Sequence, residues 1–176
     1  MDQKAYFGGG CFWCTEAVYS SLKGVKEVFP GYMGGHIKNP SYREVCTGRT
    51  GHVEVVEITY NTESIPYEIL VQVFFATHDP TTLNRQGNDV GTQYRSAIFY
   101  TDDTQKETAE NLINELKHNQ VFSNPIVTEI TPISPFYPAE DEHKNYFNRH
   151  PDQMYCAAVI APKLKKFREA YQSYIN

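Results

Sequence analysis

The sequence predicts an α/β or α+β fold built around one mixed β-sheet. Residues 52–60, HVEVVEITY, alternate side chains with the period of a β-strand. Residues 66–78 instead place apolar side chains at the spacing of one helix face. Strand-like and helix-like segments follow one another along 176 residues, of which 40% are hydrophobic. This length and order predict a single domain over residues 1–176.

The first elements are a strand and a helix on either side of three glycines. Residues 5–7, AYF, are typical of a short strand. A helix is expected from about Phe12 to Leu22, and Gly24 supplies the residue that ends it.

The strand at 52–60 has one apolar face that carries an acid. Val56, Ile58 and Tyr60 share this face at period two. Glu54 has the same parity, so its side chain is expected to point toward the same apolar side. Two valines of the opposite parity make the other face apolar as well.

The remaining elements alternate between helix and strand. Pro66 suits the first position of the helix at 66–78, and a strand is expected at residues 94–100. Asp102 or Asp103 is expected to cap the next helix. A strand near residues 126–130 and a Pro-rich loop then precede a C-terminal helix. The two later helices have the apolar stripes Ala109, Leu112, Ile113 and Leu116, and Leu164, Phe167, Tyr171 and Tyr174.

Two segments, residues 31–51 and 79–93, show little periodicity and are expected to be long loops. Loops of this length inside a compact domain are usually functional or mobile. Their glycines indicate specific backbone shapes.

Composition excludes several classes of function. The formal net charge of −5, with no basic run, gives no reason to expect nucleic acid as a partner. We find no secretory signal and no apolar stretch long enough for a membrane, so a cytoplasmic location is expected. Four cysteines are too few for a disulfide scaffold. In a reducing compartment they are expected to be thiols at rest.

The segment GGGCFWCTEA, residues 8–17, allows a metal site, a redox pair or one nucleophile with a helper. A structural zinc site needs four ligands, commonly in paired spacing, and no second pair follows Cys11 and Cys14. Cys46 with His52, or Cys156 with His150, fits zinc poorly.

A redox or nucleophilic cysteine fits the segment better. A strand, a glycine turn and a helix start would place Cys11 among unpaired backbone N–H groups, which stabilise a thiolate. Cys14 lies three residues later, within reach of a disulfide after modest adjustment. Phe12 and Trp13 are expected either to wall a small apolar pocket or to belong to the core.

Three blocks in order from residue 8 to about residue 100 carry the functional signal: GCFWCTEAVY, NPSYREVCTGRTGHVEVVEITY and QGNDVGTQYRSAI. Together they resemble methionine sulfoxide reductase A, the peptide-methionine (S)-S-oxide reductase family. The resemblance implies a two-layer sandwich with a central mixed sheet, ferredoxin-like and elaborated by long loops. It also implies reduction of the S epimer of methionine sulfoxide, free or in proteins, as a repair of oxidised proteins.

The resemblance implies roles for individual residues. Cys11 becomes the nucleophile, and Phe12 and Trp13 hold the methyl group of the substrate. Thioredoxin is the usual reductant, with dithiothreitol as a substitute; no bound cofactor or metal is expected, and the protein is expected to be a monomer. The residues implied to line the site are Tyr42, Glu54, Asp89 and Tyr94.

Two departures from the family leave the regeneration of Cys11 open. Many members have glycine where this chain has Cys14, and many carry a glycine-rich C-terminal tail with recycling cysteines. Proximity favours Cys14 as the resolving thiol. Cys156, in HPDQMYCAAVIAPKL, is the alternative, because the residues upstream suggest a loop that could swing over the site. Cys46 ranks third.

The chemistry of a sulfoxide explains the need for an acid. A thiolate attacks the sulfoxide sulfur, but the oxygen cannot leave as an unprotonated anion. Glu54 on an apolar face would keep a proton, because burial disfavours its charged form. Tyr42 and Tyr94 add neutral donors, and Asp89 would position water or the substrate backbone. After attack, Cys11 would carry a sulfenic acid that a second thiol converts to a disulfide.

Three other functions remain open from the residues alone. They are a thiol–disulfide oxidoreductase acting on proteins, a Cys–His hydrolase using His52 or His143, and a zinc-binding module without catalysis.

Overall fold

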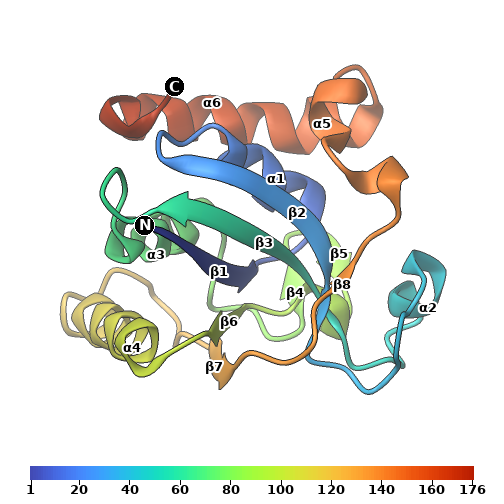
Figure 1. Ribbon diagram of the computed structural model, residues 1–176, viewed down its shortest axis with the longest axis horizontal. Coiled ribbons are helices and arrows are strands. Elements are labelled where there is room, and N and C mark those ends of the chain that lie inside the picture. Colours follow the sequence, from blue (N-terminus) through green and yellow to red (C-terminus); the bar gives the residue numbers. More distant parts are fainter.

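The computed structural model describes residues 1–176 and has a central six-stranded sheet (Figure 1). The strand order is β7-β6-β1-β3-β2-β8, and only the β6–β7 pair is parallel, which confirms the mixed sheet. β4 and β5 form a separate ribbon. The strands are β1 (Asp2–Gly8), β2 (Val25–Met33), β3 (Val53–Asn61), β4 (Arg85–Gln86), β5 (Asp89–Val90), β6 (Ala97–Tyr100), β7 (Glu129–Pro132) and β8 (Tyr137–Pro138).

One face of the sheet is covered by helices, which gives the two layers. The cluster beneath them joins side chains of β1 and β3 to α1, α3 and α4, and α6 contacts both α1 and α3. The predicted α/β class is confirmed, and the finer ferredoxin-like description stays a prediction. The helices are α1 (Phe12–Ser20), α2 (Tyr42–Cys46), α3 (Tyr67–Thr77), α4 (Asp103–His118), α5 (Tyr146–Arg149) and α6 (Ala161–Ala170).

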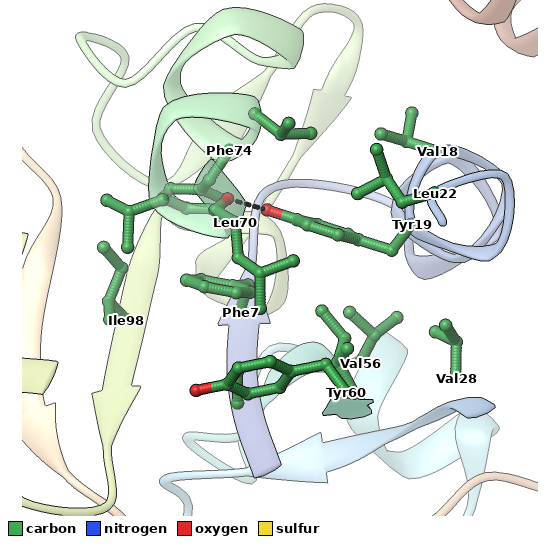
Figure 2. Packing of buried hydrophobic residues seen from close by; sticks show 14 of the residues in the cluster. Phe7, Val18, Tyr19, Leu22, Val28, Val56, Tyr60, Leu70, Phe74 and Ile98 are labelled. Carbon is green, nitrogen blue, oxygen red and sulfur yellow. Dashed lines mark hydrogen bonds between the residues drawn. The ribbon is translucent and has the colours of Figure 1, made fainter. Parts of the chain in front are cut away.

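Aromatic side chains fill the centre of this core (Figure 2). Phe7 of β1 stacks on Tyr19 of α1 and on Phe74 of α3, with ring centroids 5.4 and 5.2 Å apart. The buried Tyr19 hydroxyl donates to the Leu70 carbonyl oxygen at 2.7 Å, so its polar atom is satisfied (Figure 2). These contacts fix α1 relative to β1, and the turn between the two elements carries Cys11.

The period of β3 is confirmed. Val56, Ile58 and Tyr60 are fully buried in the cluster beneath the helices. Glu54 lies on the same side, since its carboxylate reaches the N–H of Phe12 at the start of α1. The valines of opposite parity belong to a smaller cluster on the other face.

The strand β2 was not anticipated, and the expectation of a loop from residue 31 is wrong for its last residues. Pro30 and Gly31 obscure it, because both are rare inside strands. Ala139 N–H donates to Pro30 O at 2.9 Å, so the missing N–H of Pro30 faces the outer side, where pairing with β8 is short. A side chain at Gly31 would lie 2.5 Å from the Tyr137 carbonyl oxygen, so this approach requires glycine.

Several boundaries also differ from expectation. Residues 31–51 contain the short helix α2, capped reciprocally by Ser41 and Glu44. Residues 79–93 contain the β4–β5 ribbon. Tyr94 lies in a 3₁₀ turn, and the strand predicted at 94–100 begins only at residue 97. The strand predicted near 126–130 starts three residues later than expected. The helix α1 ends two residues before the expected Leu22. The last two tyrosines of the C-terminal apolar stripe, Tyr171 and Tyr174, lie beyond the end of α6.

No helix of the chain combines the length and apolarity that a membrane crossing requires.

Candidate active site

Cys11 lies at the turn between β1 and α1, immediately before the first helical residue. Gly10 has φ of +93°, a conformation that favours glycine. The Cys11 carbonyl accepts the N–H groups of Cys14 and Thr15 at 3.1 and 3.4 Å, which starts the helix. Cys11 is 8% exposed, so this cysteine is buried at a helix N-terminus.

Burial dominates the protonation of Cys11. It raises the pKa of the thiol well above its ordinary value, and the N–H of Trp13 opposes the shift only in part. The expectation that the helix terminus alone gives a thiolate near neutral pH is therefore wrong for the resting protein. The sulfur has to lose its proton during the reaction.

Glu54 supplies a buried acid beside Cys11. Its Oε1 accepts the N–H of Phe12 at 3.1 Å, while its buried Oε2 has no hydrogen-bond partner in the protein. Burial raises the pKa of Glu54 to about 8, so the carboxyl group keeps its proton at pH 7. An acid with a free, protonated oxygen is thus held next to the candidate nucleophile.

Two tyrosines and an aspartate complete the polar side of the site. Burial, reinforced by the charge of Glu54, raises the pKa of the Tyr42 and Tyr94 hydroxyls, so both remain donors. Asp89 Oδ2 accepts the Tyr155 hydroxyl at 2.7 Å. Residues of β3, α2, the β4–β5 ribbon and the turn after it thus lie close enough to influence one another, and their roles in the reaction stay predictions.

The apolar side of the site begins with Phe12 and Trp13. Phe12 is fully buried, and its ring centroid lies 6.1 Å from that of Tyr42. Trp13 is partly exposed and stacks on Tyr146 at 3.8 Å. Its Nε1 donates to His143 Nδ1 at 3.1 Å. Phe12 therefore belongs to the core and Trp13 packs against it, whereas their role as walls of a substrate pocket stays a prediction.

Residues 137–155 form a wall of the site that the sequence did not predict, since His143 is expected only as the base of a hydrolase and Tyr155 has no expected role. His143 lies 4.4 Å from the Tyr42 ring and 5.4 Å from the Phe12 ring, and Tyr155 lies edge-on to Trp13 at 6.0 Å. No periodicity marks this segment, so its place beside α1 could not be predicted from local pattern.

Hydrogen bonds hold this segment over the start of α1. Glu140 accepts the Tyr32 hydroxyl at 3.0 Å and the Tyr42 N–H at 2.9 Å. The buried carboxylate of Glu16 accepts the Asn145 N–H at 2.9 Å. Segments far apart in the sequence are thereby joined around Cys11.

The remaining cysteines have different surroundings, and all four are free thiols. Cys14 and Cys156 are buried in one small apolar cluster with Ile160. Cys156 starts a π-helical run, Cys156–Ile160, that continues into α6. The upstream residues 150–153 form turns, as expected, and their movement over the site stays a prediction. Cys46 is exposed on α2.

Comparison with known proteins decides the family. A family model described as peptide methionine sulfoxide reductase matches residues 3–175. The chain belongs to this family. It therefore reduces methionine sulfoxide and is an oxidoreductase, as its resemblance implied.

Individual relatives agree along nearly the whole chain. The peptide methionine sulfoxide reductase MsrA of Chromobacterium violaceum is 57% identical over 174 residues, which covers 99% of both chains. That of Deinococcus radiodurans is 55% identical over 170 residues, covering 97% of this chain and 82% of the relative. Among solved structures, methionine sulfoxide reductase A of Corynebacterium diphtheriae is 38% identical, with a TM-score of 0.77 over 85% of this chain and 76% of that one. Reduced Mxr1 of Saccharomyces cerevisiae is 34% identical, with a TM-score of 0.79 over 88% and 89%.

Within this reductase, the histidines do not support hydrolysis. His52 accepts the Gly35 N–H at Nδ1 and contacts the Ile37 carbonyl at 2.7 Å through Nε2, so it holds the loop before β3. His143 uses Nδ1 to accept the Trp13 indole N–H. Neither arrangement leaves a base paired with Cys11.

The cysteines do not form a zinc site either. The ligand-type side chains that lie close enough to share an ion are Glu140, Glu142 and His143, a set without a cysteine. Both oxygens of Glu140 and Nδ1 of His143 already have hydrogen-bond partners. These contacts build the wall of the reductase site instead.

Proposed function

We propose that this reductase acts on the S epimer of methionine sulfoxide, free or in proteins, with Cys11 as nucleophile and Glu54 as acid. The observation that carries the proposal is the buried Glu54 carboxyl group, whose Oε2 has no hydrogen-bond partner beside the first turn of α1. Burial raises its pKa to about 8, which favours the protonated form at pH 7. A neutral acid suits a neutral substrate whose oxygen must gain a proton.

The first half-reaction transfers one oxygen atom. Glu54 Oε2 protonates the sulfoxide oxygen, with the hydroxyls of Tyr42 and Tyr94 as further donors. The sulfur of Cys11 attacks the sulfoxide sulfur, and its thiol proton returns to Glu54. This attack forms a transient sulfur–sulfur bond, which breaks as the oxygen, now a hydroxyl group, moves from the substrate sulfur to the Cys11 sulfur; methionine leaves and Cys11 becomes a sulfenic acid. The substrate sulfur is reduced and the cysteine sulfur is oxidised by two electrons.

The apolar wall selects a methyl group. Phe12 and Trp13 would hold the methyl group of the substrate, and Asp89 would fix its backbone or a water. Tyr146 covers one face of the Trp13 indole, and His143 fixes its N–H, so the ring has a set orientation. Such an oriented wall would distinguish the two epimers by which substituent it accepts.

The second half-reaction regenerates Cys11. Cys14 lies one helical turn from Cys11 and packs against Cys156, so we place it first. Cys156 would then receive the disulfide from Cys14. Thioredoxin is the proposed reductant, since Mxr1 of Saccharomyces cerevisiae has been solved in complex with Trx2; that chain is 25% identical, with a TM-score of 0.55 over 82% of this chain and 84% of that one. The absence of a cofactor, the monomeric state and the cytoplasmic location stay predictions.

The test is turnover of the separate S and R sulfoxides of methionine with dithiothreitol. We expect turnover of the S epimer alone, and none by Cys11→Ser even with excess dithiothreitol. Equal rates on both epimers would contradict the stereochemical assignment, and appreciable turnover by Cys11→Ser would contradict the nucleophile. An insulin-reduction assay on the same samples tests the thiol–disulfide oxidoreductase alternative.

A further inference from the structure

A small cavity of about 10 Å³ lies beside Cys14, and Cys11 does not line it. Thr15 of α1, Phe74 and Thr77 of α3, and His78 contribute to its wall. Lys163 of α6 also lines the cavity and is the only cationic side chain in its wall. The resolving cysteine proposed above therefore has a lysine as a neighbour, from an element far away in the sequence.

Lys163 is in an unusual position for a lysine. It is partly buried, while the next two lysines of α6, Lys165 and Lys166, are exposed. It belongs to none of the three ion pairs of the protein. Its ammonium group therefore has no carboxylate partner within ion-pair distance. A surface cleft of about 650 Å³, which Lys163 also lines, keeps one side of this group near solvent.

The charge of Lys163 acts on Cys14 and also on His78. Burial raises the pKa of the Cys14 thiol, and the Lys163 ammonium is the strongest influence in the opposite direction. The Tyr155 hydroxyl, 3.9 Å from the Cys14 sulfur, adds to it, whereas Asp89 and Cys156 act against a thiolate.

Two further groups complete the surroundings of Cys14. His78 is neutral, because burial lowers its pKa to about 4. Burial also raises the pKa of Cys156, and no group offsets that shift. Of the two candidate resolving thiols, only Cys14 has a cation beside it.

We propose that Lys163 is a positioning residue for regeneration: its ammonium group stabilises the thiolate of Cys14, so that Cys14 attacks the Cys11 sulfenic acid before Cys156 does. The inference rests on the proposed function of Cys11. A sulfur–sulfur bond forms between Cys14 and Cys11, and the sulfur–oxygen bond of the sulfenic acid breaks. The oxygen leaves as water, with the sulfenic hydrogen and the proton that the Cys14 thiol loses. Cys14 is oxidised and the sulfenic sulfur is reduced.

The experiment is a single turnover with one equivalent of methionine sulfoxide and no reductant, in the Cys156→Ser background. Methionine release reports the first half-reaction, and loss of dimedone-reactive sulfenic acid reports disulfide formation, both measured from pH 6 to pH 10. The variants are Lys163→Gln and Lys163→Arg. The matched control is Lys166→Gln, because Lys166 lines the same surface cleft but not the cavity beside Cys14.

We expect Lys163→Gln to release methionine at the unchanged rate but to form the disulfide about 3–10-fold more slowly at pH 7, since each unit of thiol pKa changes the thiolate fraction about tenfold. The rates should converge at high pH, and Lys163→Arg and Lys166→Gln should match the parent. Disulfide formation by Lys163→Gln at the parent rate across the whole pH range overturns the proposal. So does an equal loss in Lys166→Gln.

Peptide mapping of the chain with all its cysteines gives a second readout. We expect a Cys11–Cys14 bridge first; a Cys11–Cys156 bridge that forms first would contradict the proposal. Failure of the parent to release methionine would instead contradict the proposed function, so the two failures are distinct.

Discussion

Replacement of Glu54 by glutamine removes the proposed acid and keeps the shape of the side chain. The amide oxygen can still accept the Phe12 N–H that Oε1 accepts at 3.1 Å, so the start of α1 is preserved. With a pKa of about 8, about 90% of the carboxyl groups are protonated at pH 7, and the variant loses this proton source entirely. We expect the rate of methionine release in a single turnover to fall roughly 10²–10⁴-fold, the usual span for general acid catalysis.

The pH dependence gives a second signature of the same group. In the parent, methionine release should decline as the pH rises above about 8, because Glu54 then loses its proton. The residual rate of Glu54→Gln should lack this decline. A parent rate that stays constant through pH 9, or a Glu54→Gln variant that forms sulfenic acid at the parent rate, would refute the assignment and move the role to Asp89 or a tyrosine.

The stability of the same variant should change in the opposite direction to its activity. The folded chain keeps the Glu54 proton up to a pKa of about 8, while the unfolded chain loses it near the ordinary glutamate pKa of 4.5. Stability of the parent therefore falls as the pH rises through this window, by about 1.4 kcal/mol per unit at most. Glu54→Gln lacks this loss, so its stability relative to the parent should increase by about 2–3 kcal/mol from pH 5 to pH 7 in urea unfolding.

Three further substitutions test separate parts of the structure. Cys14→Ser should lose most thioredoxin-driven turnover while methionine release in a single turnover stays unchanged; a full-rate Cys11–Cys156 bridge in this variant would make Cys14 a bystander. Tyr42→Phe should slow methionine release roughly 10–10²-fold through loss of one donor to a charge-developing oxygen, and an unchanged rate would leave Tyr94 as the sole phenolic donor. Leu70→Ala, in the core beneath α3, should lower the free energy of unfolding by about 2–5 kcal/mol with little effect on the activity of the folded protein; an equal loss of activity would show that the core and the site are coupled.

The side of β3 on which Glu54 lies was predictable because it depends on local periodicity alone. Successive side chains of a strand point to opposite faces, so residues two apart share a face. The spacing of Glu54, Val56 and Ile58 therefore places the Glu54 side chain on the same face as the two apolar residues. The helix α3 was predictable for the same reason, from the spacing of its apolar residues.

The strand β2 and the wall of the site were not predictable from local pattern. Pro30 and Gly31 fit into a strand because they pair with β3 on one side, while the chain around Tyr137 closely approaches the other side. His143 and Tyr155 take their places through long-range contacts to Trp13 and Asp89. Such contacts leave no periodic signal in the sequence.

The protonation of the site also required the fold. The sequence placed Cys11 at a helix start, which predicts a thiolate, but burial of the thiol outweighs the helix terminus. The same burial makes Glu54 an acid at pH 7. How deeply a group is buried depends on the whole chain. The sequence alone therefore could not show that burial keeps both the Cys11 thiol and the Glu54 carboxyl group protonated.

The central claim is that Cys11 takes the oxygen atom of the S sulfoxide. The most direct measurement is mass spectrometry of the Cys14→Ser/Cys156→Ser double variant after one equivalent of the S sulfoxide, without reductant. In this variant neither resolving thiol can remove the sulfenic acid, so it should persist. We predict one equivalent of methionine and one added oxygen atom, located on the peptide that contains Cys11 and trapped by dimedone. Methionine formation with the oxygen on another residue, or no oxygen transfer at all, would contradict the account.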